Sequence, residues 1–277
     1  MYAILPDLLF VLIALFCVTS IAVFATTIYL HRCLAHHSIE ILSERFERFL
    51  NRAILITTGQ NREEWVAVHR KHHTFTDKKG DPHSPLVLGF WKVQLFNVYY
   101  YICAARTPGI VKTFAPDISS RRGDSTVLRG FRGLTIGIAV LILAGVVFSF
   151  SQGYSVRYGV FPGALVAILY GMFLGLLVAA VHAFLYVFVL SPSINGLCHW
   201  SGVKRFPDTP AFNNRLLGWF VAGEGLHNNH HKYPRSPKFS IFRGDSDPAW
   251  PIIKLLAKAK LIVIVWEIGV PETVAYP

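Results

Sequence analysis

The chain contains three clusters of histidines whose spacing is typical of metal ligands. They read HRCLAHH at 31–37, HRKHH at 69–73 and HNNHH at 227–231. On a helix, positions i, i+3 and i+4 share one face, so the second and third clusters can each direct three imidazoles to one side. His31 and His36 are about 140° apart on an ideal helix, so they reach one site only if the helix ends or loosens between them. Because the apolar run before them stops here, we expect it to end.

The number of histidines narrows the choice of metal. Structural zinc takes four ligands and catalytic zinc about three plus water, so eight or more histidines fit two metal ions better than one zinc. Imidazole suits iron, copper, nickel or zinc, and the absence of clustered thiolates disfavours copper(I). The cysteines form no CxxC pair, which argues against a disulfide framework, a zinc ribbon or an iron–sulfur cluster; they are Cys17, Cys33, Cys103 and Cys198. Two redox-active metals would indicate oxygen chemistry.

The elements that position these histidines are predicted to be membrane helices. Of the 277 residues 53% are hydrophobic and 16% charged, too apolar for an ordinary soluble domain. A crossing needs about 20 apolar residues, and 7–30, 133–152 and 160–190 qualify. The first run is too long for a signal-peptide core, so we expect it to be retained. The other two should form a hairpin near Arg157.

The third run is longer than one crossing requires. We therefore expect it to tilt, to kink at Gly171 or Gly175, or to continue past the membrane surface.

The basic residues predict the orientation of these spans. Residues 31–132 hold 16 of the 27 Lys and Arg, 191–277 hold another 10, and Arg157 alone lies between. By the positive-inside rule both stretches are cytoplasmic, with the N-terminus outside and the C-terminus inside. The net charge of +11 is then a topology signal, and no nucleic-acid partner is expected. Eleven of the twelve histidines share this compartment, which disfavours a solvated or adventitious patch.

Other apolar segments are too short or too charged to cross. Residues 86–105 and 250–270 are interrupted by lysine and carry aromatic residues, which predicts helices at the interface. A fourth crossing at 49–61 is disfavoured, because Arg52 and Arg62 bound only about nine residues.

The predicted fold class is all-α: a polytopic membrane protein with three to four transmembrane helices and a cytoplasmic, histidine-rich helical cap. No internal repeat or low-complexity linker divides the chain. We therefore expect a single domain over 1–277, with the cap formed by 31–132 and 191–277.

The motifs around the histidines resemble those of a known enzyme family. The first cluster has the spacing HxxxxH, the second lies in WVAVHRKHHTFTDKKGDPHSP and the third in GEGLHNNHHKYPRS. A further NxxxH element, INGLCHW, contains Asn195 and His199. From about residue 26 to 245 the chain resembles the integral-membrane fatty acyl desaturases, in particular the Δ9, stearoyl-CoA desaturase-like branch.

The resemblance implies a di-iron centre held by nine histidines, with Asn195 joining through a water molecule. The nine matching positions are His31, His36, His69, His72, His73, His199, His227, His230 and His231.

Carboxylates near the motifs could orient these ligands. A ligating imidazole usually donates its other N–H to a carboxylate or carbonyl. Close to the motifs in sequence are Glu64, Asp77, Asp81 and Glu224; Glu64 and Glu224 could equally be solvated charges.

Three histidines fall outside the ligand set. We expect supporting or structural roles for His37 and His83. We expect a hydrogen-bonded interior position for His182, within the third apolar run.

The resemblance also implies the reaction and its partners. Two iron ions and O2 would remove two hydrogens from neighbouring acyl carbons, forming a cis double bond, predicted at Δ9, and water. The acyl chain could be carried by coenzyme A, a carrier protein or a membrane lipid. Electrons must come from an external ferredoxin, cytochrome b5-like protein or reductase, which basic residues could dock, although solvated charge is as good a reading; they are Arg70, Lys71, Lys78 and Lys79. The predicted location is the bacterial inner membrane, with the active site on the cytoplasmic side.

A narrow apolar tunnel should place the acyl chain. From their position before His31, we expect Thr19, Val23 and Thr27 to limit chain length. Relatives usually have a transmembrane pair before the first histidine motif, whereas about 30 residues precede it here, so one span is expected to be missing.

Two other functions compete with desaturation. Related histidine-rich membrane enzymes hydroxylate alkanes, sterols or carotenoids, or decarboxylate or further desaturate fatty acids; the NxxxH element and GEGLHNNHH favour desaturation. A non-enzymatic metal-binding or transport protein would need ionisable residues along its spans, where apart from His182 there are almost none.

Overall fold

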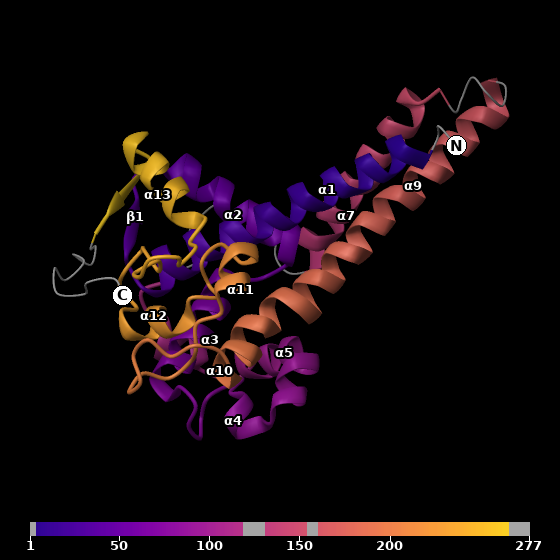
Figure 1. Ribbon diagram of the computed structural model, residues 1–277. Coiled ribbons are helices and arrows are strands. Elements are labelled where there is room, and N and C mark those ends of the chain that lie inside the picture. Colours follow the sequence, from indigo (N-terminus) through magenta and orange to yellow (C-terminus); the bar gives the residue numbers. More distant parts are fainter. Residues whose placement is uncertain (1–3, 119–130, 154–159, 266–277) are drawn as a thin grey trace. The chain divides into compact units, whose positions relative to one another are not determined.

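The computed structural model describes residues 4–118, 131–153 and 160–265, and helices form most of it (Figure 1). Within these residues the strands are two segments of three residues, so the predicted all-α class is confirmed. The chain forms two compact units. Among the described residues, the first unit comprises 4–22, 52–59, 131–153 and 160–186, and the second comprises 23–51, 60–118 and 187–265. The single domain expected over 1–277 stays a prediction.

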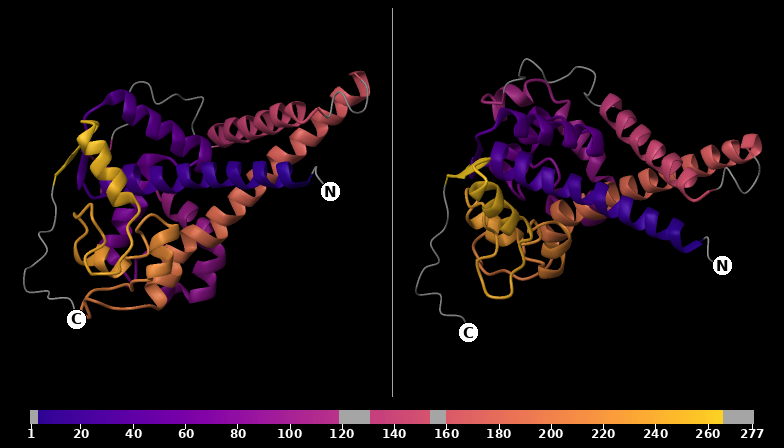
Figure 2. Two further views of the ribbon diagram at one scale, coloured as in Figure 1. Left: turned by 45° about the horizontal axis from the view of Figure 1, so that its top comes forward. Right: turned by 90° about the horizontal axis from the view of Figure 1, so that it is seen from above.

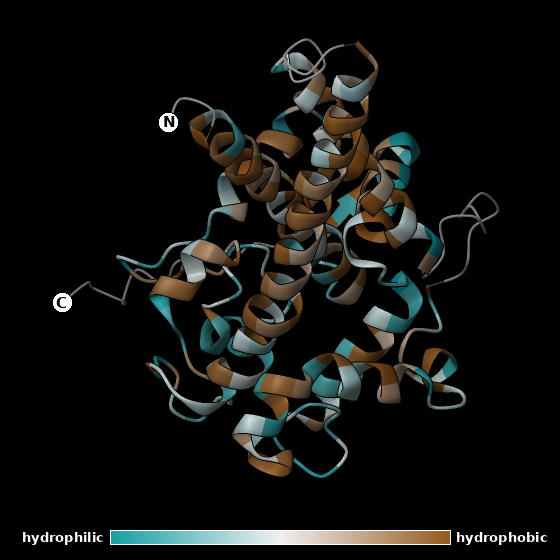
Figure 3. Ribbon diagram, turned by 90° about the vertical axis from the view of Figure 1, so that its right-hand side faces the viewer, coloured by the Kyte–Doolittle hydropathy of each residue, from teal (hydrophilic) through white to brown (hydrophobic). Residues whose placement is uncertain are grey.

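Three helical stretches in the described residues are long and apolar enough to cross a membrane, as predicted. They are Ile4–Ala35, Phe131–Ser151 and Val160–Trp200. Figure 3 shows apolar residues along most of the length of the long helices. Helix α2 (Glu44–Thr58) has 15 residues, or about 22 Å, which is shorter than a bilayer core of about 30 Å. The fourth crossing disfavoured at 49–61 is therefore not formed.

The third apolar run continues further than a single crossing needs. Helix α9 (Val160–Phe184) is followed by wide π-helical turns at η3 (Leu185–Leu190) and η4 (Ser193–Leu197), and then by α10 (Cys198–Trp200). The helical stretch therefore runs on to Trp200, and whether it tilts in the membrane or passes beyond its surface stays a prediction. The hairpin turn predicted near Arg157 lies outside the described residues.

Glycines set the close packing within the first unit. Helices α7 (Phe131–Ser151) and α9 lie side by side (Figures 1 and 2). A Cβ on Gly171 would meet the backbone of Val146, and one on Gly175 would meet the backbone of Leu141 and Ile142. Gly171 and Gly175 thus form a small-xxx-small contact of the kind that lets membrane helices approach closely.

His182 joins segments of the first unit by hydrogen bonds. Nδ1 of His182, on α9, lies 3.0 Å from the hydroxyl of Thr19, on α1 (Ile4–Ala25), and Nε2 donates to the carbonyl of Thr57 at 2.9 Å. This confirms the interior, hydrogen-bonded position expected for His182. In an apolar setting such satisfied polar groups join helices specifically.

The second unit has its core around helix α3 (Arg62–Phe75). Val66, Ala67 and Val68 of α3 are buried in one apolar cluster with Ala104 of α5 (Phe90–Ala105) and Ile110 of α6 (Ile110–Phe114). The remaining elements of this unit are β1 (Ile39–Ile41), α4 (Pro85–Leu88), α11 (Arg215–Phe220), α12 (His227–Lys232), α13 (Ala249–Lys258) and β2 (Ile262–Ile264). Helix α3 therefore holds one histidine cluster on a packed scaffold.

Two predicted interface helices are changed by local structure. The segment 86–105 is helical but is divided at Gly89, whose φ of +100° favours glycine. The helix predicted over 250–270 is wrong beyond α13: Lys260 has a φ of 56°, and β2 pairs antiparallel with β1. The β-branched residues of both segments favour the strand. Residues 266–270 lie outside the described residues.

We predict that Gly175→Leu destabilises the first unit by about 1–3 kcal/mol or more, because the new side chain overlaps the α7 backbone. The thermal unfolding midpoint of the purified protein in detergent should fall. Ala180→Leu adds the same side chain at an exposed position of α9 and should leave the midpoint unchanged. Equal midpoints for the two variants would contradict the close helix contact.

Candidate metal centre

The first histidine cluster lies on a widened helix. α1 passes directly into the π-helix η1 (Thr26–Ala35), and the N–H of His36 donates to the carbonyl of His31 at 3.1 Å. An i→i+5 bond brings residues five apart onto nearly one face, and the ring centroids of His31 and His36 are 4.8 Å apart. The expectation that the helix ends here is wrong; of the two alternatives, the helix loosens.

The second cluster occupies the last turns of α3. The side chain of Asn61 caps the start of this helix by accepting from the N–H groups of Glu63 and Glu64. His69, His72 and His73 then follow at the i, i+3, i+4 spacing of one helix face.

The third cluster lies on a six-residue helix that its own asparagines hold in place. Asn228 accepts from the N–H groups of Arg205 and Phe206, both at 2.8 Å. Asn229 accepts from the amide of Asn213 at 2.7 Å and donates to the carbonyl of Phe239 at 2.9 Å. So short a helix needs tertiary contacts for stability. These two asparagines are functional residues that the histidine motifs alone do not identify, although their place between the histidines was a signal.

The structure brings all nine predicted histidines into two groups. Within each group the candidate ligand atoms lie within 4.8 Å of one another. The five-histidine group consists of His31, His36, His69, His73 and His230, and the four-histidine group of His72, His199, His227 and His231. The groups adjoin, because the rings of His73 and His231 stack with centroids 4.4 Å apart.

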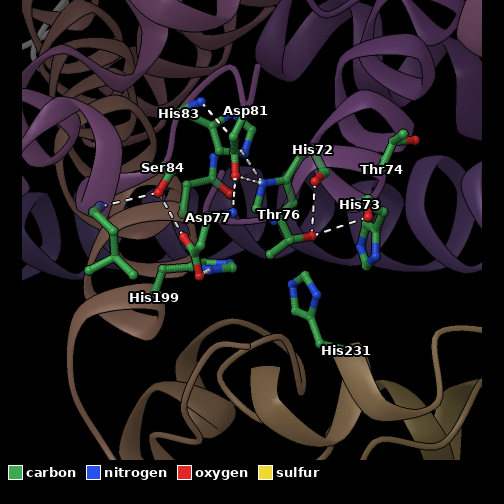
Figure 4. Close-up of polar contacts among 12 residues, drawn as sticks. His72, His73, Thr74, Thr76, Asp77, Asp81, His83, Ser84, His199 and His231 are labelled. Carbon is green, nitrogen blue, oxygen red and sulfur yellow. Dashed lines mark hydrogen bonds and ion pairs between the residues drawn. The ribbon is translucent and has the colours of Figure 1, made fainter. Parts of the chain in front are cut away.

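Three of the four predicted carboxylates hold one histidine each through Nδ1. The pairs are His31 with Glu224 at 2.7 Å, His72 with Asp81 at 2.9 Å and His199 with Asp77 at 3.0 Å. Figure 4 shows the last two pairs. Ser84 also donates to Asp77, at 2.7 Å. Glu64 is exposed in the first turn of α3.

The carboxylates decide which ring nitrogen faces the group. A neutral imidazole that carries its proton on Nδ1 has a lone pair on Nε2. Nε2 of His72 and of His199 are buried without a hydrogen-bond partner in the described part of the chain. Nε2 of His230 lies 3.2 Å from that of His31 and 3.0 Å from that of His73. So many converging lone pairs are unfavourable by themselves and fit a cation between them.

The protonation states suit metal binding. Burial first, and then charge on neighbouring imidazoles, lowers the pKa well below its usual value for His36, His69, His73, His227, His230 and His231. Burial acts to raise the pKa of the carboxyls, but their histidine partners outweigh it and lower the pKa of Asp77, Asp81 and Glu224. Neutral imidazoles and ionised carboxylates are the forms that a metal site requires.

The other histidines of the second unit lie outside the two groups. His37 is exposed and lies 3.1 Å from Asp117, which Arg70 also binds. His83 is buried and stacks on His72, with centroids 4.7 Å apart. Burial first, and then charge on His72, lowers the pKa of His83 to about 3. The supporting or structural roles expected of His37 and His83 stay predictions.

The other residues predicted for the site are Asn195 and the three residues expected to line the acyl tunnel. The amide of Asn195 donates to Asn97 at 3.1 Å, and its water-mediated contact with metal stays a prediction. Thr27 is buried and donates to Glu224. The tunnel roles of Thr19, Val23 and Thr27 also stay predictions.

This arrangement defines a class of protein: a helical protein with membrane-length helices and two adjoining histidine groups that could bind metal. A family model described as fatty acid desaturase matches residues 6–240, and the chain belongs to this family. It is therefore an acyl desaturase and an integral membrane protein.

Individual relatives agree with this family. The chain is 28% identical to the Delta-9 acyl-lipid desaturase 2 of Arabidopsis thaliana over 249 residues. The matched region is 88% of this chain and 70% of that protein. It is 29% identical to the Acyl-CoA C20 Delta5-desaturase of Anemone leveillei, over 91% of this chain and 71% of that protein. It is 26% identical to the sn-1 stearoyl-lipid 9-desaturase of Synechocystis sp., over 90% of this chain and 68% of that protein.

We predict that the metal-free protein loses stability as the pH falls below about 6.5. The unfolded chain takes up protons near that pH, whereas the buried histidines resist protonation, so acid favours unfolding. The contribution is complete above about pH 6.5 and declines below it. The thermal midpoint measured after chelation should be lower at pH 5.5 than at pH 7.5.

Two variants separate the histidines of the two groups from the exposed His37. His37→Ala, at an exposed position, should keep the pH dependence of the wild type, and His73→Ala should weaken it. A midpoint independent of pH between 5.5 and 7.5 would contradict this account.

Proposed function

We propose that this desaturase binds two iron ions, one in each histidine group. The observation that carries the proposal is the pair of adjoining groups, each with its candidate ligand atoms within 4.8 Å of one another. When bound, reduced iron supplies O2 activation: O2, two electrons and two protons convert –CH2–CH2– of an acyl chain to –CH=CH– and two water molecules. Imidazole is a suitable ligand for iron.

The protein's own side chains prepare this site. Neutral imidazoles offer lone pairs, and the carboxylates of Glu224, Asp81 and Asp77 orient His31, His72 and His199 through Nδ1. Burial of most of these rings excludes bulk water. We further propose Asn195 as a water-mediated partner.

We propose a cis double bond at Δ9 as the product. The Δ9 acyl-lipid relative from Arabidopsis thaliana and the stearoyl-lipid relative from Synechocystis sp. support this position, while the Delta5 relative provides the alternative. The acyl chain would be carried by a membrane lipid, coenzyme A or a carrier protein.

The proposed electron donor is an external ferredoxin, cytochrome b5-like protein or reductase. Of the basic residues considered for docking, Lys78 and Lys79 are exposed. Arg70 instead binds Asp117 at 2.5 Å and the carbonyls of Leu34 and Ala35. The cytoplasmic side of a bacterial inner membrane is the proposed location, on the basis of the positive-inside rule.

Product analysis tests the activity. Wild type or His230→Ala would be expressed in a host that lacks its own desaturase, and total fatty acids analysed by mass spectrometry with double-bond localisation. We expect a new chain, lighter by two hydrogens and unsaturated at Δ9, with wild type and with the control His37→Ala, but not with His230→Ala. A Δ5 product would correct the position, and oxygenated or shortened chains would replace desaturation by hydroxylation or decarboxylation.

Metal content tests the cofactor. Purified wild type should contain two iron ions per chain, measured by elemental analysis, and His72→Ala and His73→Ala should each lose metal because each removes a ligand from one group. His37→Ala should retain the wild-type content. One ion per chain in wild type, or another metal in its place, would overturn the di-iron proposal.

A further inference from the structure

A buried arginine lies directly behind the five-histidine group. The side chain of Arg32 is 1% exposed, and its guanidinium carbon lies 3.9 Å from the ring centroid of Phe239. That ring is packed against His31 and His230, at centroid distances of 5.7 and 4.9 Å. A charge buried this deeply must be paired, so its partners are informative.

The first partner of Arg32 is an aspartate more than 200 residues away in sequence. Nη2 of Arg32 donates to both carboxylate oxygens of Asp247, at 3.0 and 3.1 Å. The carboxylate is fully buried and also accepts from the N–H of Phe239 at 2.9 Å. Burial raises the pKa of Asp247, and the Arg32 charge opposes that rise. Asp247 thus fixes both the guanidinium and the backbone that carries Phe239.

The other side of the guanidinium leads to a predicted ligand. Nη1 of Arg32 donates to the hydroxyl of Thr27 at 2.5 Å, and Thr27 in turn donates to Oε1 of Glu224. The same oxygen accepts from Nδ1 of His31 at 2.7 Å and lies 3.9 Å from Nη1 of Arg32. Asp247 is therefore connected to His31 through an unbroken series of buried contacts.

The backbone before Glu224 makes a tight turn close to Arg32 and Asp247. Ala222 and Gly223 both have positive φ, 51° and 96°. A Cβ on Gly223 would meet Oδ1 of Asp247 and would lie 3.0 Å from Nη2 of Arg32. Backbone in this region is unfavourable for residues other than glycine and is retained where it positions a group. The turn thus brings Glu224 to His31 around the ion pair.

We propose that Arg32 and Asp247 are positioning residues for the metal ion of the five-histidine group. The ion pair holds Thr27 and Glu224 so that the carboxylate turns Nε2 of His31 toward Nε2 of His230. This inference rests on the proposed metal centre and adds a layer to it: residues that touch no predicted ligand atom set the direction of His31.

Metal affinity, measured separately from activity, tests this role. Iron(II) would be titrated into chelator-treated full-length protein in competition with a chromophoric chelator, which gives an affinity for each of the two ions. Asp247→Asn should weaken the binding of one iron ion about 10–100-fold, which is the range for groups that orient a metal ligand. The affinity for the other ion should not change. Arg32→Lys, which keeps the charge but loses the planar fork, should weaken the same ion.

A double variant tests whether Asp247 acts through Glu224. Glu224→Gln should weaken the same ion, and adding Asp247→Asn should have little further effect, because both changes interrupt one series of contacts. Fully additive losses of affinity would overturn the proposed route.

The matched control is Glu47→Gln, which alters a partly buried carboxylate paired with the buried Arg62 at 3.3 Å. It should change thermal stability without changing either affinity. If Asp247→Asn behaves in the same way, its role is only structural and the inference is overturned.

If Asp247→Asn fails to fold, Arg32→Lys and Gly223→Ala decide the question by the same titration. Wild type that binds fewer than two ions would overturn the proposed centre and this inference together; two ions with unchanged variant affinities would overturn only the inference.

Discussion

Imidazole lone pairs that meet in a protein interior impose the constraint on which this structure depends. A neutral imidazole has one donor and one acceptor, and both need partners when they are buried. Here carboxylates accept hydrogen bonds from the Nδ1–H groups of His31, His72 and His199. The Nε2 lone pairs that remain also need partners, and the two metal ions proposed above would supply them. The carboxylates, the low pKa values of the histidines and their burial are consequences of the same requirement.

Segments that depart from regular α-helix position several of these histidine side chains. The apolar stretch that begins with α1 widens into η1 and carries His31 and His36, while the stretch that begins with α9 widens into η3 and η4 before His199. π-helical turns are rare in proteins, and those that occur often lie at functional sites. Two of the three membrane-length stretches therefore continue without interruption into predicted metal ligands.

The network behind the centre shows how distant segments are joined to it. Asp247 and Phe239 come from the last described part of the chain, and Arg32 and Thr27 from the first stretch. Buried polar groups of this kind are costly when incomplete and restrictive when complete. The asparagines of α12 act similarly, because Asn228 and Asn229 satisfy backbone groups of neighbouring loops.

The sequence by itself determined what depends on residue type and local spacing. The apolar runs predicted the spans, and the helical spacing of His69, His72 and His73 predicted one shared face. Four carboxylates near the motifs were candidate partners for histidine; three of them pair with one, and Glu64 is exposed. Only the tertiary structure decided that the helix at His31 widens where an end was expected, that residues 262–264 form a strand, and which histidines share a group. It also revealed Arg32 paired with Asp247. The pairing of residues 39–41 with 262–264 and the ion pair of Arg32 with Asp247 join segments more than 200 residues apart, and no local pattern records such contacts.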